Sequence, residues 1–91
     1  MIEPHEALVN VTYRDGVNFD LRDPVHYGAT DGDIKMMVSE AIRTGSVAGV
    51  EPDPQVDLQH FAIERVDRPL RPEQGQREHN MILVRPKTAY G

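Results

Sequence analysis

The five residues that close this 91-residue sequence are the ones best suited to chemistry. Lys87, Thr88, Ala89 and Tyr90 lead to Gly91, and they follow Pro86 with no apolar pattern of their own. Because glycine has no Cβ, its backbone adopts conformations closed to other residues and lets another backbone approach closely. Five extended residues reach about 16–18 Å, far enough to place the Gly91 carboxylate in a narrow cleft of another protein. We therefore predict Gly91 as the reactive residue and residues 87–90 as the segment that a partner recognises.

The rest of the chain offers no competing catalytic chemistry. It contains no cysteine, which excludes disulfides, thiolate zinc sites and a cysteine nucleophile. The four histidines, His5, His26, His60 and His79, have no metal-ligand spacing, so we predict no metal site. No phosphate-binding loop, nucleophile elbow or catalytic triad is present. We predict a protein that is not an enzyme and that needs no cofactor.

Composition narrows the class of partner and the compartment. The formal charge of −5 argues against nucleic-acid binding through phosphate neutralisation. No apolar run approaches the roughly 20 residues that span a bilayer, and residues 1–6 lack the pattern of a signal peptide. The absence of cysteine favours the cytoplasm. A chain of this size forms one domain with a thin core, which favours a binding module, a carrier or a tag.

The first structured segment is predicted to be an antiparallel hairpin over residues 7–22. Its first strand is rich in β-branched residues, and Asp15-Gly16 is a typical hairpin turn. After the turn, Val17, Phe19 and Leu21 alternate with polar residues, as in a strand buried on one face. Val9, Val11 and Tyr13 are predicted to share that buried face.

A helix over about residues 31–44 is predicted to cover the hairpin, after a loop over residues 23–29. Thr30 with Asp33 approximates a capping box, and Gly45 suits a left-handed helix end. The helix presents one apolar stripe at helical spacing. Its members are Ile34, Met37, Val38, Ala41 and Ile42.

The second half of the chain is predicted to be irregular over residues 46–59 and then to form strands. Residues 60–66 form a strand with Phe61 and Ile63 on one face, and Leu70 begins a very short strand. A polar loop over residues 71–79 precedes the last strand, residues 81–84, whose continuous apolar run predicts pairing on both edges. Pairing is expected to stop near Pro86, which has no N–H to donate.

This order of elements resembles the β-grasp fold of ubiquitin-like proteins. The local sequences that carry the resemblance are Asp33-Ile34-Lys35-Met36-Met37-Val38, Arg68-Pro69-Leu70 and Ile82-Leu83-Val84-Arg85. The chain looks most like the ubiquitin-like modifiers of bacterial operons that also encode E1-like, E2-like and JAB-type proteins. The resemblance implies an α+β fold with a mixed four- to five-stranded sheet packed on one helix. It divides the chain into a flexible leader (1–6), a β-grasp domain (7–86) and a flexible tail (87–91).

The resemblance also implies a function. An E1-like enzyme would activate the Gly91 carboxylate, and an E2-like enzyme would pass it by thioester to a target protein, with a JAB-type peptidase as a further partner. Many such modifiers end in Gly-Gly, whereas this chain ends in Tyr90-Gly91. Two alternatives remain: a sulfur carrier with a C-terminal thiocarboxylate, and an unconjugated adaptor that binds partners by its sheet face. The expected face contains Ala62, Leu83 and Arg85, or else the register neighbours Ile63 and Val84, because a one-residue slip exchanges the two faces.

Overall fold

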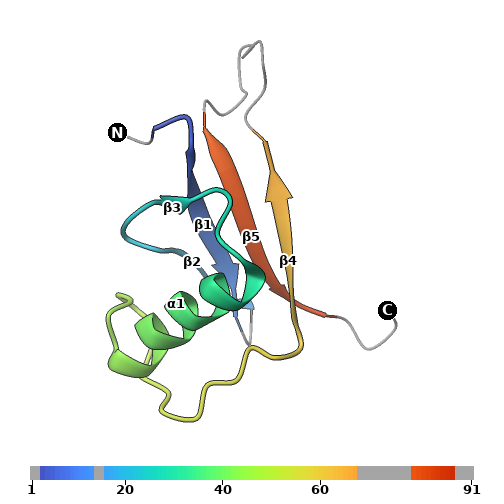
Figure 1. Cartoon of the computed structure of the whole chain (residues 1–91). Coiled ribbons are helices and arrows are strands. Elements are labelled where there is room, and N and C mark those ends of the chain that lie inside the picture. The colour runs from blue at the N-terminus through green and yellow to red at the C-terminus, as the bar shows by residue number, and fades with distance from the viewer. Residues whose placement is uncertain (1–2, 14–15, 68–78, 88–91) are drawn as a thin grey trace.

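The computed structural model describes residues 3–13, 16–67 and 79–87. It has an α+β architecture in which one mixed sheet is covered on one face by one helix (Figure 1). The elements in chain order are β1 (Glu6–Thr12), β2 (Asn18–Asp20), β3 (Val25–His26), α1 (Asp31–Thr44), β4 (Phe61–Val66) and β5 (Asn80–Pro86). The predicted short strand at Leu70 and nearly all of the predicted loop over residues 71–79 lie outside the described residues.

The centre of the sheet is the parallel pair β1 and β5, in the order β2-β1-β5-β4. β2 is antiparallel to β1, and β4 is antiparallel to β5. The last strand is therefore paired on both edges, as its apolar run predicts. It is also longer than predicted, because Pro86 still lies opposite Phe61 and the Lys87 N–H donates to the His60 carbonyl at 3.4 Å.

The hairpin prediction is confirmed, with a shorter second strand. Val9, Val11 and Tyr13 are buried, and Gly16 has the positive φ, 74°, that the turn requires. Phe19 pairs opposite Val11 and packs against the core. The prediction is wrong for Val17, which is 36% exposed.

The predicted loop over residues 23–29 contains a strand that sequence reasoning missed. In β3, Val25 lies opposite Ala7 and His26 opposite Glu6. The Tyr27 N–H extends this pairing by donating to the His5 carbonyl at 2.9 Å. Two residues are too few to show the alternation that identifies a strand in a sequence. The strand can be recognised only from its pairing with β1.

The helix begins and ends as predicted. The Asp33 N–H donates to the Thr30 side chain at 3.1 Å, and Gly45 caps the other end in the left-handed conformation with φ of 74°. The buried stripe is narrower than predicted, because Met37 is 37% exposed. The core lies between α1, β1 and β5, with one contribution from the irregular segment over residues 46–59. Its members are Ala7, Val9, Val11, Tyr13, Ile34, Val38, Ile42, Leu58, Ile82 and Val84.

One buried polar side chain fastens the beginning of the chain to the last strand. Asn80 is 6% exposed, and its Nδ2 donates to the carbonyl oxygens of Pro4 and Glu6, at 3.0 Å each. Four residues of the predicted leader, 3–6, are thus described, and two of them are held against β5.

The replacement Asn80→Ala is expected to lower the free energy of unfolding by about 1–3 kcal/mol, because it removes the two hydrogen bonds that the buried Asn80 amide donates. Urea unfolding followed by circular dichroism measures this loss. Gln55→Ala, at an exposed amide in the irregular segment, is the matched control and is expected to change stability by less than about 0.5 kcal/mol. Equal losses in the two variants would contradict the fastening role of Asn80.

Candidate functional site

The pairing of β4 with β5 places the three predicted partner-contact residues on one face of the sheet. Ala62 lies directly opposite Arg85, and Glu64 lies opposite Leu83. Directly opposite residues of antiparallel strands point to the same face. Ile82 and Val84 are fully buried under α1, so the alternate residues Leu83 and Arg85 point to the face away from the helix.

The other register considered from the sequence, with Ile63 and Val84 at the surface, is wrong. Val84 is fully buried, and Ile63 lies opposite it and packs against the core. Ala62 and Arg85 are exposed, and Leu83 is half-buried. The pairing with two neighbours fixes the faces of β5, which its uniformly apolar sequence could not do.

Three further apolar residues join this surface from neighbouring positions. The parallel register aligns Leu8 of β1 with Met81, and the antiparallel register aligns Val66 of β4 with Met81. All three are half-buried. We call the surface the sheet-face patch and define it as Leu8, Ala62, Val66, Met81 and Leu83. Sequence reasoning missed Leu8, although it is an apolar residue at a position that the hairpin alternation assigns to the wet face.

The part of the outer face over β1 and β2 is polar, and its side chains form hydrogen bonds with one another. Asn10 Nδ2 donates to the side-chain oxygens of Asn18 at 2.9 Å and Asp20 at 2.7 Å. Asn18 Nδ2 donates in return to Asn10 at 3.0 Å and to the Thr12 hydroxyl at 3.0 Å. These side chains already satisfy one another's hydrogen-bonding groups. Burial by a partner protein would therefore favour the apolar sheet-face patch over this polar part of the face.

The tail begins at the end of the strand that carries Leu83 and Arg85. Lys87, which follows β5 directly, is exposed. Thr88, Ala89, Tyr90 and Gly91 lie outside the described residues, so their assignment as a recognised and reactive tail stays a prediction. Arg85 on the outer face precedes Lys87 by two residues. A partner that contacts Arg85 therefore lies next to the start of the tail.

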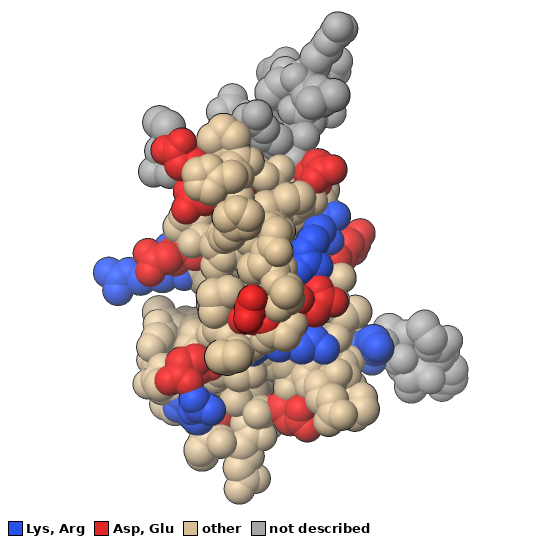
Figure 2. Space-filling view, in the orientation of Figure 1, with Lys and Arg blue, Asp and Glu red and all other residues tan. Residues whose placement is uncertain are grey.

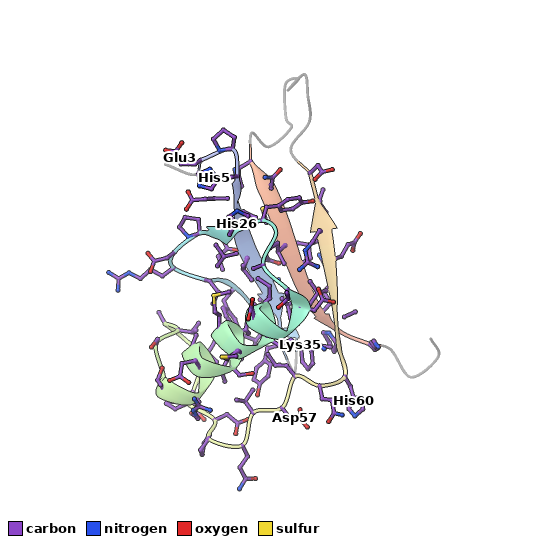
Figure 3. All side chains as sticks on the ribbon, viewed as in Figure 1. Glu3, His5, His26, Lys35, Asp57 and His60 are labelled. Carbon is purple, nitrogen blue, oxygen red and sulfur yellow. The ribbon has the colours of Figure 1, made fainter. Side chains whose placement is uncertain are left out.

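Two groups of titratable side chains lie at opposite ends of the fold (Figure 3). His5 and His26 come together across β1 and β3 with ring centroids 5.9 Å apart, and the Gly28 N–H donates to His26 Nδ1 at 2.9 Å. Sequence spacing could not reveal this pair, because it depends on the unrecognised strand β3. At the other end, Lys35 Nζ donates to the Gln59 carbonyl at 3.2 Å and ties α1 to the segment before β4.

Arg65 joins β4 to the beginning of the helix. Its Nη1 lies 2.6 Å from Asp31 Oδ1, and its other terminal nitrogen donates to the Ala29 carbonyl. Charges of both signs are spread over the helix-bearing face of the molecule (Figure 2). Arg65 therefore has a positioning role: it holds the edge strand against the helix.

Tyr27 lies near this contact, and its pKa is raised above the ordinary value. Burial is the main cause, and the Tyr27 hydroxyl also donates to the Asp67 carboxylate, whose negative charge adds to the effect while Arg65 opposes it. The neutral phenol is therefore the form that the folded state stabilises. This contribution to stability is complete below the unfolded-state pKa of about 10 and is lost as the pH rises through the higher folded-state pKa.

Tyr27→Phe is expected to flatten the alkaline loss of stability. Unfolding free energies measured by urea titration between pH of about 8 and about 11 should fall more steeply for the unmodified protein than for the variant. Parallel curves for the two proteins would contradict the assignment.

In residues 3–13, 16–67 and 79–87, no three histidine or carboxylate side chains are grouped to hold a metal ion. Within the same ranges no helix is long and apolar enough to cross a membrane. No protein-family model, curated protein or solved structure matches the chain.

Proposed function

We propose that this chain is a ubiquitin-like protein modifier with a β-grasp fold, conjugated through the carboxylate of Gly91. The observation that supports the proposal best is the sheet order β2-β1-β5-β4, with the first and last strands parallel at its centre and a single helix across one face. A parallel pair needs a long crossover, and here α1 belongs to that crossover. The arrangement is compatible with the β-grasp fold that the sequence resembles.

The position of β5 supports the second part of the proposal. β5 is paired with β1 as far as Val84 and with β4 as far as Pro86, so the residues after it start from a strand that is held in the sheet. Lys87, the first residue after β5, is exposed. A rigid body beside a short polar segment lets a partner gain binding energy at the sheet-face patch while the reacting carboxylate enters its active site.

The proposed chemistry proceeds in four displacements. The Gly91 carboxylate oxygen attacks the α-phosphate of ATP on an E1-like enzyme, which forms an acyl adenylate and releases pyrophosphate. A cysteine thiolate of the enzyme attacks the acyl carbon and releases AMP, which gives a thioester. After exchange to an E2-like thiol, an amine of the target attacks the thioester, forms an amide bond, loses a proton and releases the thiol. All catalytic groups belong to the partners, and this chain supplies the carboxylate.

Intact-mass spectrometry tests the first two steps. The protein is incubated with ATP and an E1-like enzyme from the same organism, and the expected product is a thioester adduct that a reducing thiol removes. A variant that lacks Gly91 is expected to give no adduct. If the two proteins behave alike, the proposal fails; if the protein instead gains the mass of an oxygen-to-sulfur exchange in cells, the chain is a sulfur carrier.

An unconjugated adaptor is the second candidate, and the sheet-face patch favours it. Leu8, Met81 and Leu83 form an apolar surface beside the exposed Arg85, which suits a protein partner. Leu83→Glu would weaken the binding of such a partner, while deletion of residues 87–91 would leave binding and biological activity intact. The modifier proposal requires the opposite result for the deletion.

A further inference from the structure

The strand β4 forms one edge of the sheet. It ends the strand order β2-β1-β5-β4 and is the outermost strand on the right of Figure 1. It spans six residues, pairs with β5 in an unbroken register and contains no proline. Edge strands of natural proteins are commonly shortened, bulged or interrupted by proline, which prevents pairing with another chain. β4 has none of these features, so its edge can accept a further strand.

The backbone groups of Ile63 and Arg65 point to this edge. The Lys87 N–H donates to the His60 carbonyl at 3.4 Å, which identifies these two as a hydrogen-bonded pair. Bonded residues alternate along an antiparallel strand, so the even-numbered residues of β4 bond to β5. Ile63 and Arg65 therefore direct their N–H and C=O groups away from β5. Among the described residues, no strand lies beyond β4 to pair with these groups.

Two charged side chains on the outer face lie at positions that suit pairing with a copy of the same strand. Glu64 and Arg85 are exposed, and neither forms an ion pair with another described residue. Arg85 lies opposite Ala62, whose small side chain covers little of the sheet. A strand added outside β4 would lie two strand spacings, about 10 Å, from Arg85, a distance that a glutamate and an arginine side chain span together.

We propose that two copies of this chain associate through β4, in an antiparallel pairing centred on Ile63, to form one continuous sheet. In this register Ile63 lies opposite Ile63 of the second copy, and Glu64 lies opposite Ala62 of the second copy. Glu64 of each copy then reaches Arg85 of the other across that alanine. The twofold axis is perpendicular to the sheet, so both helices cover one face, and the sheet-face patch is present twice on the other. This association is separate from the chemistry at Gly91 and does not depend on it.

The charges of β4 select this register. A pairing centred on Glu64 would place the two Glu64 carboxylates directly opposite each other, and a pairing centred on Arg65 would do the same for the two guanidinium groups. Like charges directly opposite one another destabilise a sheet. The pairing centred on Ile63 instead brings together two half-buried apolar side chains, each of which packs against its own core. This register thus combines apolar contact on the helix side with charge complementarity on the outer side.

Sedimentation velocity and amide hydrogen exchange on the full chain test the proposal. Between about 10 µM and about 1 mM, the range in which a small interface associates, the sedimentation coefficient is expected to rise from that of a monomer to that of a dimer. Over the same range the Ile63 amide should exchange more slowly, because it enters a hydrogen bond with the second copy. Added salt should weaken the association, because it screens the contacts between exposed charges. A monomer at every concentration overturns the proposal, and so does an Ile63 amide whose exchange does not depend on concentration.

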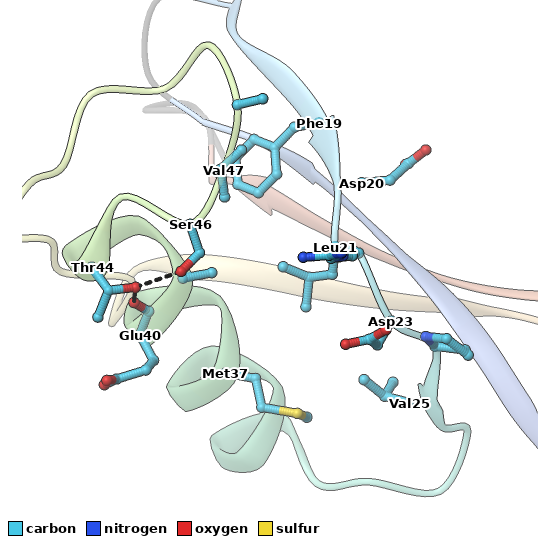
Figure 4. Close-up of a pocket in the computed structure, with 14 residues that line it drawn as sticks. Phe19, Asp20, Leu21, Asp23, Val25, Met37, Glu40, Thr44, Ser46 and Val47 are labelled. Carbon is cyan, nitrogen blue, oxygen red and sulfur yellow. Dashed lines mark hydrogen bonds between the residues drawn. The ribbon is translucent and has the colours of Figure 1, made fainter.

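Charge reversal provides matched variants. Glu64→Arg and Arg85→Glu each replace attraction by repulsion at both contacts, so each variant alone is expected to dimerise at least about tenfold more weakly. A mixture of the two variants restores opposite charges at both contacts, and its heterodimer is expected to be about as stable as the unmodified dimer. Glu40→Arg makes the same charge change on α1, beside the pocket at the other edge of the sheet, and should leave dimerisation unaltered (Figure 4).

Circular dichroism confirms that each variant is folded. A contact between Glu64 and Arg85 within one chain would not restore association in the mixture, so the heterodimer isolates the contact between copies. Undiminished dimerisation of either single variant overturns the proposal, and so does a mixture that associates no better than its components.

Discussion

Replacement of Gly91 with valine is expected to slow thioester formation with the E1-like enzyme by about 100-fold or more, because a displacement of about 1 Å at a reacting carboxylate has an effect of this size. The variant keeps its carboxylate, so the loss isolates the need for a residue without Cβ. The branched Cβ of valine would both clash with a narrow cleft and exclude backbone conformations that glycine adopts. The rate is measured by quenched-flow sampling and intact mass.

Two controls make this result interpretable. The unfolding free energy of Gly91→Val should equal that of the unmodified protein, since Pro86 is the last residue of the sheet. Met36→Val, on the exposed outside of α1, should react at the unmodified rate. Equal rates for Gly91→Val and the unmodified protein would mean that the glycine has no part in the reaction.

Replacement of Ile34 with alanine is expected to lower the free energy of unfolding by about 2–5 kcal/mol. Ile34 is fully buried in the first turns of α1 and belongs to the core between the helix and the central strands. Small domains have only about 5–15 kcal/mol of stability, so the loss is a large share of the total. Urea unfolding measures it, and Met36→Ala in the same helix, at a position 66% exposed, should change stability by about 0.5 kcal/mol or less.

A small loss for Ile34→Ala, similar to that of Met36→Ala, would contradict the helix-on-sheet core. A large loss would also predict that conjugation falls with the folded fraction rather than through the reacting carboxylate. The two variants Ile34→Ala and Gly91→Val thus separate the contribution of the body from that of the tail.

Features set by local chemistry could be predicted from the sequence. The helix is the clearest case, since Thr30, Asp33 and Gly45 act on residues within one turn of themselves. The burial of Val9 and Val11 followed from the alternation within one strand. Val17 continues the apolar alternation but is exposed. Alternation alone does not bury a residue, because burial also requires another element of the chain to cover it.

Features set by distant pairing could not be predicted. β3 is two residues long and exists because the first half of β1 offers an open edge on that side. The faces of β5 could not be read from Met81-Ile82-Leu83-Val84, and only the register with Leu8 and Val66 assigns them. The pocket lined by Phe19, Leu21 and Met37 brings together residues from different elements, which no local pattern encodes.

The structure describes one part of the candidate site, on β4 and β5, and not the other, at residues 88–91. Ala62, Leu83 and Arg85 were among the residues expected to share a face, and the β4–β5 register brings them to the outer one. The reactive end, residues 88–91, lies outside the described residues and rests on the chemistry of glycine and on the β-grasp resemblance. A direct chemical observation at Gly91 therefore carries the most weight.

Peptide mass spectrometry of conjugates supplies that observation. The affinity-tagged protein is expressed in its native cells, purified under denaturing conditions and digested with trypsin, which cleaves after Lys87. The modifier proposal predicts target lysines that carry Thr88-Ala89-Tyr90-Gly91 through an isopeptide bond. Recovery of this segment only as a free peptide with its carboxylate intact, with no lysine bearing it, would contradict the proposal.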